Sequence, residues 1–282
     1  MHKVMILTDS TADLSQAYII KNDIATIPLF IRFNEEIYLD GIDMTPSSLY
    51  HKVEQEKVMA KSSGLRSADF NIVFKKYLTR GYDIVYIGVS SKLSGSFQSA
   101  EIARNSMEKE RIFLVDSLNL SAGLGLLVAK AVDLRNEGLP AIKIKEVLEM
   151  LIPKVRSYYI VPSLDYLYIG RKINGIQKTL GKIIGLKPII AIMHGQVKVY
   201  KKPFGSMEKL IGKLVAIYEK DYPFTDISHF MVTQSLAAKC KDYLLGIIHE
   251  RFELKDIIEC DAGCVISCHT GKGTLGIAYL KK

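Results

Sequence analysis

The chain has 282 residues, of which 48% are hydrophobic and 24% charged, and its formal net charge is +8. This length favours two domains, and the composition is that of a globular protein that can bury substantial cores. No apolar run reaches the about 18 residues of a membrane span, and the basic residues are spread out without a nucleic-acid-binding module, so we expect neither a spanning helix nor a nucleic-acid partner.

The first half alternates apolar strand segments with helical segments. Residues 4–8 form an apolar run that meets Asp9 and Ser10 too early for a secretory signal, so we expect a buried first strand and a cytoplasmic protein. Polar caps predict a helix from about Asp13, and Thr45-Pro46 predicts the start of another. Further strands are expected at 83–89 and 111–115, and further helices at 67–80, from about Phe97, at 122–136 and at 142–152. This alternation predicts an α/β fold with a mostly parallel N-terminal sheet and helices on both faces.

The second half has a different pattern. Residues 188–200 read as a β-hairpin, and helices are expected at 206–220 and 236–252. The last strands are expected near Val265 and Ile277. Because Pro162 interrupts the pattern, we predict an α/β domain over 1–160 and an α+β domain over 161–282.

Three evenly spaced cysteines raise the possibility of a metal site. Cys260, Cys264 and Cys268 lie four residues apart, and His269 follows the last. Zinc sites usually pair C-x2-4-C with a second pair further along the chain, whereas residues 264–268 alternate like a strand. Small buried side chains in a reducing compartment are the favoured interpretation, and we expect no metal.

Polar clusters follow three of the expected strands, at Asp9-Ser10-Thr11, at residues 90–96 and at Asp116-Ser117. In open parallel sheets, ligands bind beyond the carboxyl ends of the strands. A Ser-Gly-Ser turn that enters a helix offers hydroxyls and backbone N–H groups to an anion. Helix capping is the alternative explanation, although residues 90–96 contain four serines where one cap needs one.

Two further polar segments are ambiguous on their own. Residues 61–64 read as a loop between helical segments, and residues 268–274 lack the G-x4-G-K-[S/T] spacing of a phosphate-binding loop. Within the second segment, His269 is compatible with a ligand donor, a core histidine or a general base. From the pattern alone, a core histidine is the favoured interpretation.

Taken together, the ordered segments resemble the DegV family over essentially the whole chain. The resemblance rests on residues 8–13, on Ser90-Ser91-x-Leu93-Ser94-Gly95-Ser96-Phe97, on 115–117, 170–171 and 187–189, and on His269-x-Gly271-x-Gly273-Thr274. It implies a two-domain α/β protein that holds a long-chain fatty acid, such as palmitate, stearate or oleate, between its domains. It also implies that the protein needs no other cofactor and is not itself a catalyst. Some members resemble the acyl-binding subunit of bacterial fatty acid kinase, which implies a separate kinase subunit as partner.

The resemblance also implies which residues bind the carboxylate, namely Ser62, Ser94 and His269. The loop at 62–66 differs from the family's usual threonine-serine-glutamine-proline-serine, and Ser63 is a second possible donor in it. The remaining candidates for supporting roles are Ser91, Gly95, Ser96, Asp9, Ser10, Asp116, Arg171 and Thr270.

Two other functions stay open at this point. A stand-alone serine hydrolase would combine Ser94 with His269 and Asp9 or Asp116, although the G-x-S-x-G turn is absent. The dense basic region from Arg171 to Lys202 is either a solvated face or a docking surface for an acidic kinase partner or, transiently, an anionic membrane surface.

Overall fold

The computed structural model describes residues 2–170, 172 and 186–282. Its α-helices are α1 Gln16–Lys21, α2 Pro46–Glu56, α3 Ser67–Leu78, α4 Ser96–Asn105, α5 Ser121–Asn136, α6 Ala141–Leu151, α7 Asp165–Ile169, α8 Met207–Asp221, α9 Ala238–Arg251 and α10 Cys264–Thr270. Its strands are β1 Lys3–Asp9, β2 Ile24–Ile27, β3 Phe30–Phe33, β4 Glu36–Leu39, β5 Lys61–Ser63, β6 Tyr82–Gly88, β7 Ile112–Asp116, β8 Val155–Ile160, β9 Ile189–Met193, β10 Gln196–Lys201, β11 Thr225–Ser235, β12 Ile257–Asp261 and β13 Thr274–Lys281.

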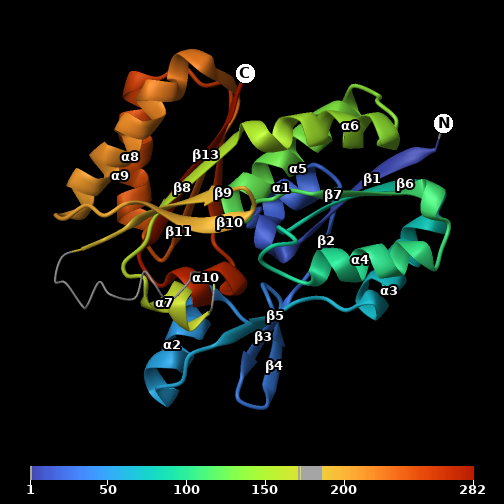
Figure 1. Ribbon diagram of the computed structural model, residues 1–282, viewed down its shortest axis with the longest axis horizontal. Helices are drawn as coiled ribbons and strands as arrows, with labels where there is room; N and C mark the ends of the chain where they lie inside the picture. The colour runs from blue at the N-terminus through green and yellow to red at the C-terminus, as the bar shows by residue number, and fades with distance from the viewer. Residues whose placement is uncertain (1, 171, 173–185) are drawn as a thin grey trace.

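The N-terminal part is built on a four-stranded sheet in the order β2-β1-β6-β7. All three strand pairs are parallel, as predicted, and the crossovers carry helices on both faces (Figure 1). The predicted start of the first helix at Asp13 is wrong. Asp13 adopts the left-handed conformation, with φ of 54°, and α1 begins only after Ser15, whose side chain accepts a hydrogen bond from the backbone N–H of Tyr18.

A second sheet of six strands follows the order β10-β9-β8-β13-β11-β12. Only β11 and β12 pair in parallel, and the other four pairs are antiparallel, as expected for an α+β unit. The hairpin predicted at residues 188–200 is formed by β9 and β10. β8 already belongs to this sheet, and the division of the chain at residue 160 stays a prediction.

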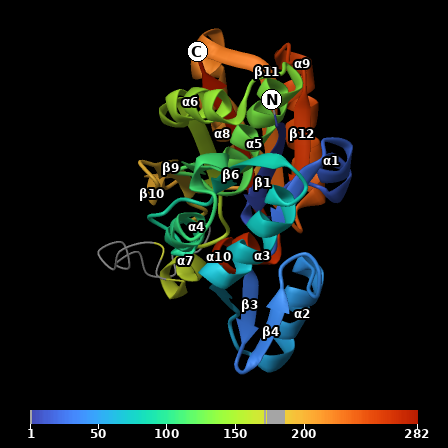
Figure 2. The same cartoon turned by 90° about the vertical axis from the view of Figure 1, so that its right-hand side faces the viewer.

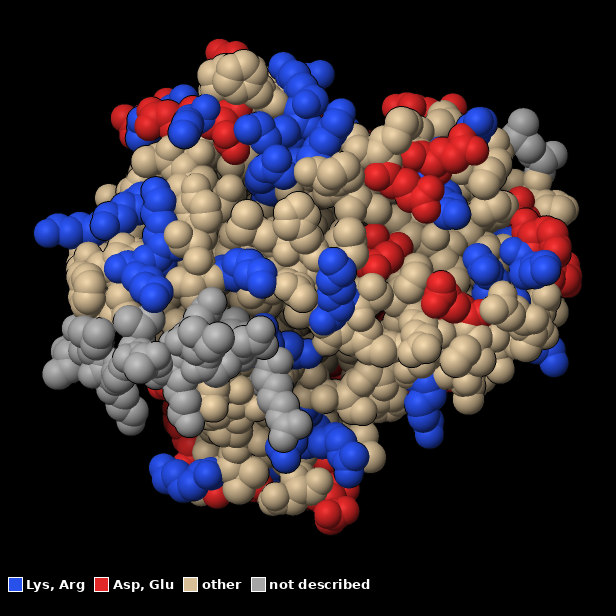
Figure 3. Space-filling model, viewed as in Figure 1, with Lys and Arg blue, Asp and Glu red and all other residues tan. Residues whose placement is uncertain are grey.

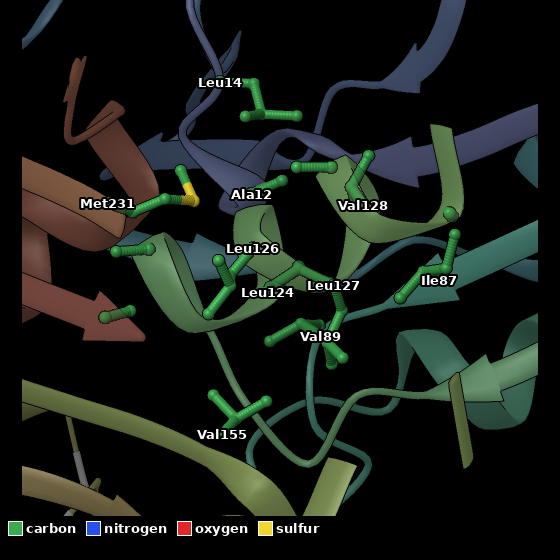
Figure 4. Packing of buried hydrophobic residues seen from close by; sticks show 14 of the residues in the cluster. Ala12, Leu14, Ile87, Val89, Leu124, Leu126, Leu127, Val128, Val155 and Met231 are labelled. Carbon is green, nitrogen blue, oxygen red and sulfur yellow. The ribbon is translucent and has the colours of Figure 1, made fainter. Parts of the chain in front are cut away.

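Helix α5 lies between the two sheets and joins their cores. Eleven of its sixteen residues are buried, because it packs against the four-stranded sheet on one side and the six-stranded sheet on the other. Figure 4 shows Leu124, Leu126 and Leu127 of this helix among Val89, Val155 and Met231 from both halves of the chain. Residues 121–129 of the helix are all buried, as is typical of a helix in a protein interior, and this core fixes the two sheets relative to each other.

A three-stranded antiparallel sheet, β4-β3-β5, extends from the rest of the fold together with α2 (Figure 2). The sequence predicts a loop at residues 61–64, which is wrong for Lys61–Ser63. These residues form β5 by pairing with Phe30–Arg32. Because the partner strand is about thirty residues away, the short polar segment itself carries no strand pattern.

The C-terminal segment 264–268, predicted as a strand, forms helix α10 instead. Each residue from Cys264 to Cys268 is buried, so the helix has no polar face from which a period of 3.6 could be recognised. Figures 1 and 2 show α10 where the three-stranded sheet meets the other two sheets. Of the described helices, each is too short or too polar to cross a bilayer.

Candidate functional site

A cavity of about 240 Å³ lies where the ends of β1 and β6 meet α10 and the three-stranded sheet. Six apolar side chains form much of its wall: Leu29, Val89, Leu93, Leu120, Val265 and Ile266. The polar part is formed by Thr11, Ser62, Ser94, Lys172 and His269. The cavity therefore combines a polar region with an apolar wall, which suits an amphipathic molecule.

His269 and Ser62 form a pair across 207 positions of the sequence. The Oγ of Ser62 lies 2.7 Å from the Nε2 of His269, and both residues are partly buried. The other side of the imidazole packs on Gly170, where a Cβ would lie 2.2 Å from Nδ1. Nδ1 is buried and has no hydrogen-bond partner among the described residues. Glycine at position 170 thus gives the ring the space to face Ser62.

Ser94 lies in the turn between β6 and α4. Its Oγ is 2.9 Å from the Oγ of Ser96, which also accepts a hydrogen bond of 3.0 Å from the backbone N–H of Leu65. A Cβ at Gly64 would lie 3.0 Å from both serine oxygens, so the segment after β5 needs glycine to approach this turn closely. These contacts place Ser62 and Ser94 on the same cavity although they come from different elements.

Lys172 and His269 are the ionisable side chains that line the cavity. Lys172 donates a hydrogen bond of 2.7 Å to the carbonyl oxygen of Leu93, and among the described residues no carboxylate forms an ion pair with it. Burial lowers the pKa of Lys172. Burial, with a smaller contribution from Lys172, lowers the pKa of His269 to about 3, so the imidazole is neutral at pH 7. A bound carboxylate would supply the negative charge that this part of the cavity lacks.

Two buried carboxyl groups, those of Asp13 and Asp40, hold the start of α10. The Oδ1 of Asp13 accepts a hydrogen bond of 2.8 Å from the N–H of Gly263, and the Oδ1 of Asp40 accepts one of 2.7 Å from the N–H of Cys264. Asp13 also accepts a hydrogen bond of 2.5 Å from Ser121 at the start of α5. These bonds satisfy N–H groups at the helix start, and they fix the helix that carries His269 to the N-terminal part of the chain.

Most of the other predicted residues do not line this cavity. Gly95 does, whereas Ser63 and Ser91 do not, and Arg171 lies outside the described residues. Asp9 is fully buried and accepts hydrogen bonds from Tyr86 and from the backbone N–H of Val89. The remaining side chains form hydrogen bonds with backbone groups. Ser10 accepts one from the N–H of Leu29, and Asp116 accepts from the N–H groups of Ser91 and Leu118. Thr270 donates one to the carbonyl oxygen of Ile266. These residues shape the loops around the cavity.

The described side chains of the cavity do not form the catalytic triad of a serine hydrolase. Ser94 bonds to Ser96, whereas His269 lies against Ser62. The carboxylate of Asp9 is occupied by Thr11, Tyr86 and Val89, so it does not orient the imidazole. A base oriented by an acid, which a hydrolase requires, is therefore missing from this arrangement of the described side chains.

Three of the four cysteines are inaccessible to solvent. Cys260, Cys264 and Cys268 are buried, whereas Cys240 is partly exposed. The residues described by the structure include no cluster of three or more His, Cys, Asp or Glu arranged to hold a metal ion. Burial raises the pKa of each of the three buried thiols, that of Cys268 to about 12, which disfavours the reactive thiolate.

The folded protein should therefore expose about one reactive thiol. Titration with a chromogenic disulfide reagent at pH 8 should modify Cys240 quickly and the other cysteines only after addition of denaturant. Replacing Cys240 by Ser should abolish the fast phase. A fast phase of two or more thiols in the folded wild type would contradict the packing of α10 and β12.

Some residues of the cavity are missing from the sequence-based set of site residues. Lys172, which lines the cavity, is in the sequence only one of several lysines in a basic region. Gly170 does not line the cavity but packs against His269, and in the sequence it is only half of a glycine-arginine motif. Thr11 belonged to a recognised cluster but was not named for the cavity. A lysine beside apolar side chains has no local signature, since its burial depends on contacts such as that with Leu93.

Comparison with known proteins places these features in a family. A family model described as "Uncharacterised protein, DegV family" matches residues 3–282. A DegV domain-containing protein of Clostridium acetobutylicum is 34% identical over 284 residues, and the match covers all of both chains. A structure described as fatty acid binding of a DegV family protein from Thermus thermophilus is 26% identical, covers 100% of both chains and superposes with a TM-score of 0.91.

A more distant structure supports the fold alone. The Fak B3 protein of Streptococcus pneumoniae fatty acid kinase, described as loaded with linoleic acid, is 20% identical and superposes with a TM-score of 0.87. The match covers 99% of this chain and 100% of that one. The chain therefore shares the α/β fold of these proteins, with its parallel sheet and its mixed sheet.

Proposed function

Because the chain belongs to the DegV family, we propose that it binds a long-chain fatty acid and holds the carboxylate with Ser62, Ser94 and His269. The observation that carries the proposal is the cavity, which these three side chains and Lys172 line together with six apolar residues. The Thermus thermophilus relative, described as binding fatty acid, supports the ligand class. Because the described side chains form no catalytic triad, we propose binding rather than catalysis as the role of the cavity.

Burial of the acyl chain supplies most of the affinity. A sixteen-carbon chain buries about 14 methylenes, worth roughly 11 kcal/mol at about 0.8 kcal/mol each before the cost of association. The cavity of about 240 Å³ is smaller than the about 300–1,000 Å³ of typical ligand sites. Binding of the whole chain therefore requires the apolar walls to separate or the acyl chain to extend beyond them.

The hydroxyls set the position of the carboxylate, so their removal should weaken binding without abolishing it. We expect Ser62→Ala and Ser94→Ala each to raise the Kd for palmitate about 10- to 100-fold, since a hydrogen bond to a charged group contributes about 1.5–3 kcal/mol. Titration calorimetry would measure this. Ser99→Ala, on α4 away from the cavity, is the matched control. Unchanged affinity in both cavity variants would contradict the proposed carboxylate site.

We further propose that the protein presents the carboxylate to a separate kinase subunit. The polar part of the cavity is open enough that His269 and Ser62 are only partly buried, which suits access by a second protein. Figure 3 shows Lys and Arg side chains spread over the half of this face that the six-stranded sheet occupies, and Lys198, Lys201 and Lys202 at its edge are exposed. A docking surface for an acidic partner is consistent with these charges.

Phosphorylation assays separate presentation from binding. With a bacterial fatty acid kinase catalytic subunit and ATP, acyl phosphate should form only when this protein is present. The triple change Lys198→Glu, Lys201→Glu, Lys202→Glu should slow that reaction while leaving the Kd for palmitate unchanged. Equal rates for the wild type and the triple variant would contradict docking through this edge.

A further inference from the structure

Among the described residues that line the cavity with Ser62, Ser94 and His269, Lys172 is the one cation. We propose that Lys172 is a specificity-determining residue, which selects the ionised form of a fatty acid over an uncharged lipid with the same chain, such as a fatty alcohol. This inference rests on the proposed function and adds to it the group that recognises charge. The hydroxyls of Ser62 and Ser94 alone can bond to an acid or to an alcohol, so they do not make this choice.

Two hydrogen bonds hold Lys172 at the cavity. Its backbone N–H donates one of 2.8 Å to the carbonyl oxygen of Leu167 in α7. Its Nζ donates one of 2.7 Å to the carbonyl oxygen of Leu93, in the turn that also carries Ser94. An ammonium group has three N–H donors, and no other described residue accepts a hydrogen bond from this one. The side chain therefore lies beside a turn with a carboxylate-binding hydroxyl and has donors left for a ligand.

No acid of the described chain neutralises Lys172. None of the described carboxylates forms an ion pair with it, and apart from His269 the other described residues that line the cavity have no ionisable side chain. Burial lowers the pKa of Lys172, because an unpaired ammonium group is costly away from water. A carboxylate bound beside it would offset this cost, whereas an alcohol would not. The charge of the cavity is therefore matched to an anion.

The ionisable groups of α10 do not replace Lys172 in this role. Burial, with a smaller contribution from Lys172, lowers the pKa of His269 to about 3, so the imidazole offers only a neutral hydrogen bond. Burial raises the pKa of the Cys268 thiol to about 12, so the thiol also stays uncharged. Neither group titrates between about pH 6 and pH 7.5, and in this range the preference for a charged head group depends on Lys172.

Removal of the cation should change the form in which the acid binds. A buried carboxylate without a partner takes up a proton, because burial disfavours its charged form. A variant that lacks Lys172 should therefore bind the protonated acid, whose fraction in water falls about tenfold per pH unit above the ordinary carboxyl pKa. Its preference for acid over alcohol should decrease as the pH rises. In the wild type the preference should stay constant as long as Lys172 is charged.

Competition between palmitate and hexadecan-1-ol tests this selection, because the two lipids share a chain length and differ in the charge of the head group. The full chain is equilibrated with both lipids on a cyclodextrin carrier at pH 6 and pH 7.5, and the bound lipids are extracted and quantified by mass spectrometry. Lys172→Met should lower the ratio of bound palmitate to bound alcohol at least about tenfold relative to the wild type at pH 7.5, and Lys172→Arg should lower it less. Lys92→Met is the matched control, since Lys92 also donates to a backbone carbonyl, that of His194, but is exposed and does not line the cavity.

The outcomes separate this inference from the proposed function. If the wild type and Lys172→Met bind palmitate with the same ratio to the alcohol at both pH values, selection by Lys172 is refuted and the proposed function stands. Weaker binding of both lipids by Lys172→Met at an unchanged ratio would leave Lys172 only a structural role, which also refutes the selection. If the wild type takes up neither lipid, the proposed function itself is refuted, and the inference with it.

Discussion

Replacing Gly170 by Ala should raise the Kd for palmitate at least about tenfold. The added Cβ would lie 2.2 Å from Nδ1 of His269 and 3.3 Å from the carbonyl oxygen of Tyr166, so the imidazole has to move. Its hydrogen bond of 2.7 Å to Ser62 would then be lost. Loss of one charge-assisted hydrogen bond to the carboxylate costs about 1.5–3 kcal/mol, which is at least tenfold in affinity.

Gly246→Ala is the matched control for this substitution. Gly246 lies within α9, and a Cβ there meets no atom within 4 Å. It should leave the affinity unchanged and raise the free energy of unfolding by about 0.5–1 kcal/mol, because alanine favours the helix. Titration calorimetry and denaturant unfolding would distinguish the two variants. Equal affinity of Gly170→Ala and Gly246→Ala would show that the position of His269 does not matter for binding.

Removal of the Asp13 carboxylate should lower both stability and fatty acid affinity. Asp13→Ala leaves the N–H of Gly263 and the hydroxyl of Ser121 without their acceptor. It also places alanine at a φ of 54°, a conformation that costs about 1–2 kcal/mol for most residues. With about 1–3 kcal/mol for a buried unsatisfied group, we expect the free energy of unfolding to fall by at least about 2 kcal/mol.

Asp13→Asn is the sharper test, because it retains an acceptor for Gly263 and tolerates the left-handed conformation. Burial raises the pKa of Asp13 well above its usual range, and Asp40 and Asp9 raise it further. The folded wild type therefore holds a proton that the unfolded chain releases above about pH 4, and its stability falls as the pH rises through the folded pKa. Asn does not titrate.

The stability of Asp13→Asn relative to the wild type should accordingly increase from pH 4 to pH 7. Urea unfolding at both pH values measures this difference, and changes common to both proteins, such as the titration of His269, cancel. A difference that is the same at both pH values, or that falls as the pH rises, would contradict the burial of this carboxylate against α10.

The sequence predicts the elements whose signals are local. The cap at Thr45-Pro46 starts α2, and the Ser-Gly-Ser turn starts α4. The apolar runs before Asp9 and Asp116 form parallel strands β1 and β7. These features depend on a few neighbouring residues, so they can be recognised without knowledge of the rest of the chain.

The parts that could not be predicted from residue patterns depend on contacts between distant segments. β5 needs its partner β3, and α10 is buried on all sides by other elements. Ser62 and His269 meet across 207 positions, and they were named for one site through the family resemblance rather than through spacing. The sequence pattern around Lys172 is that of a solvent-exposed lysine, whereas in the fold its Nζ donates a hydrogen bond to the carbonyl oxygen of Leu93.

The identity of any lipid that co-purifies with the protein tests the account most directly. We expect native mass spectrometry of protein expressed in a bacterial host to show one bound mass per chain, and an organic extract to contain a long-chain fatty acid. The bound fraction should fall in a variant that combines Ser62→Ala and Ser94→Ala. Protein that carries no lipid and does not bind added palmitate or oleate would contradict the proposal that the cavity between α10 and the strand ends holds an acyl chain.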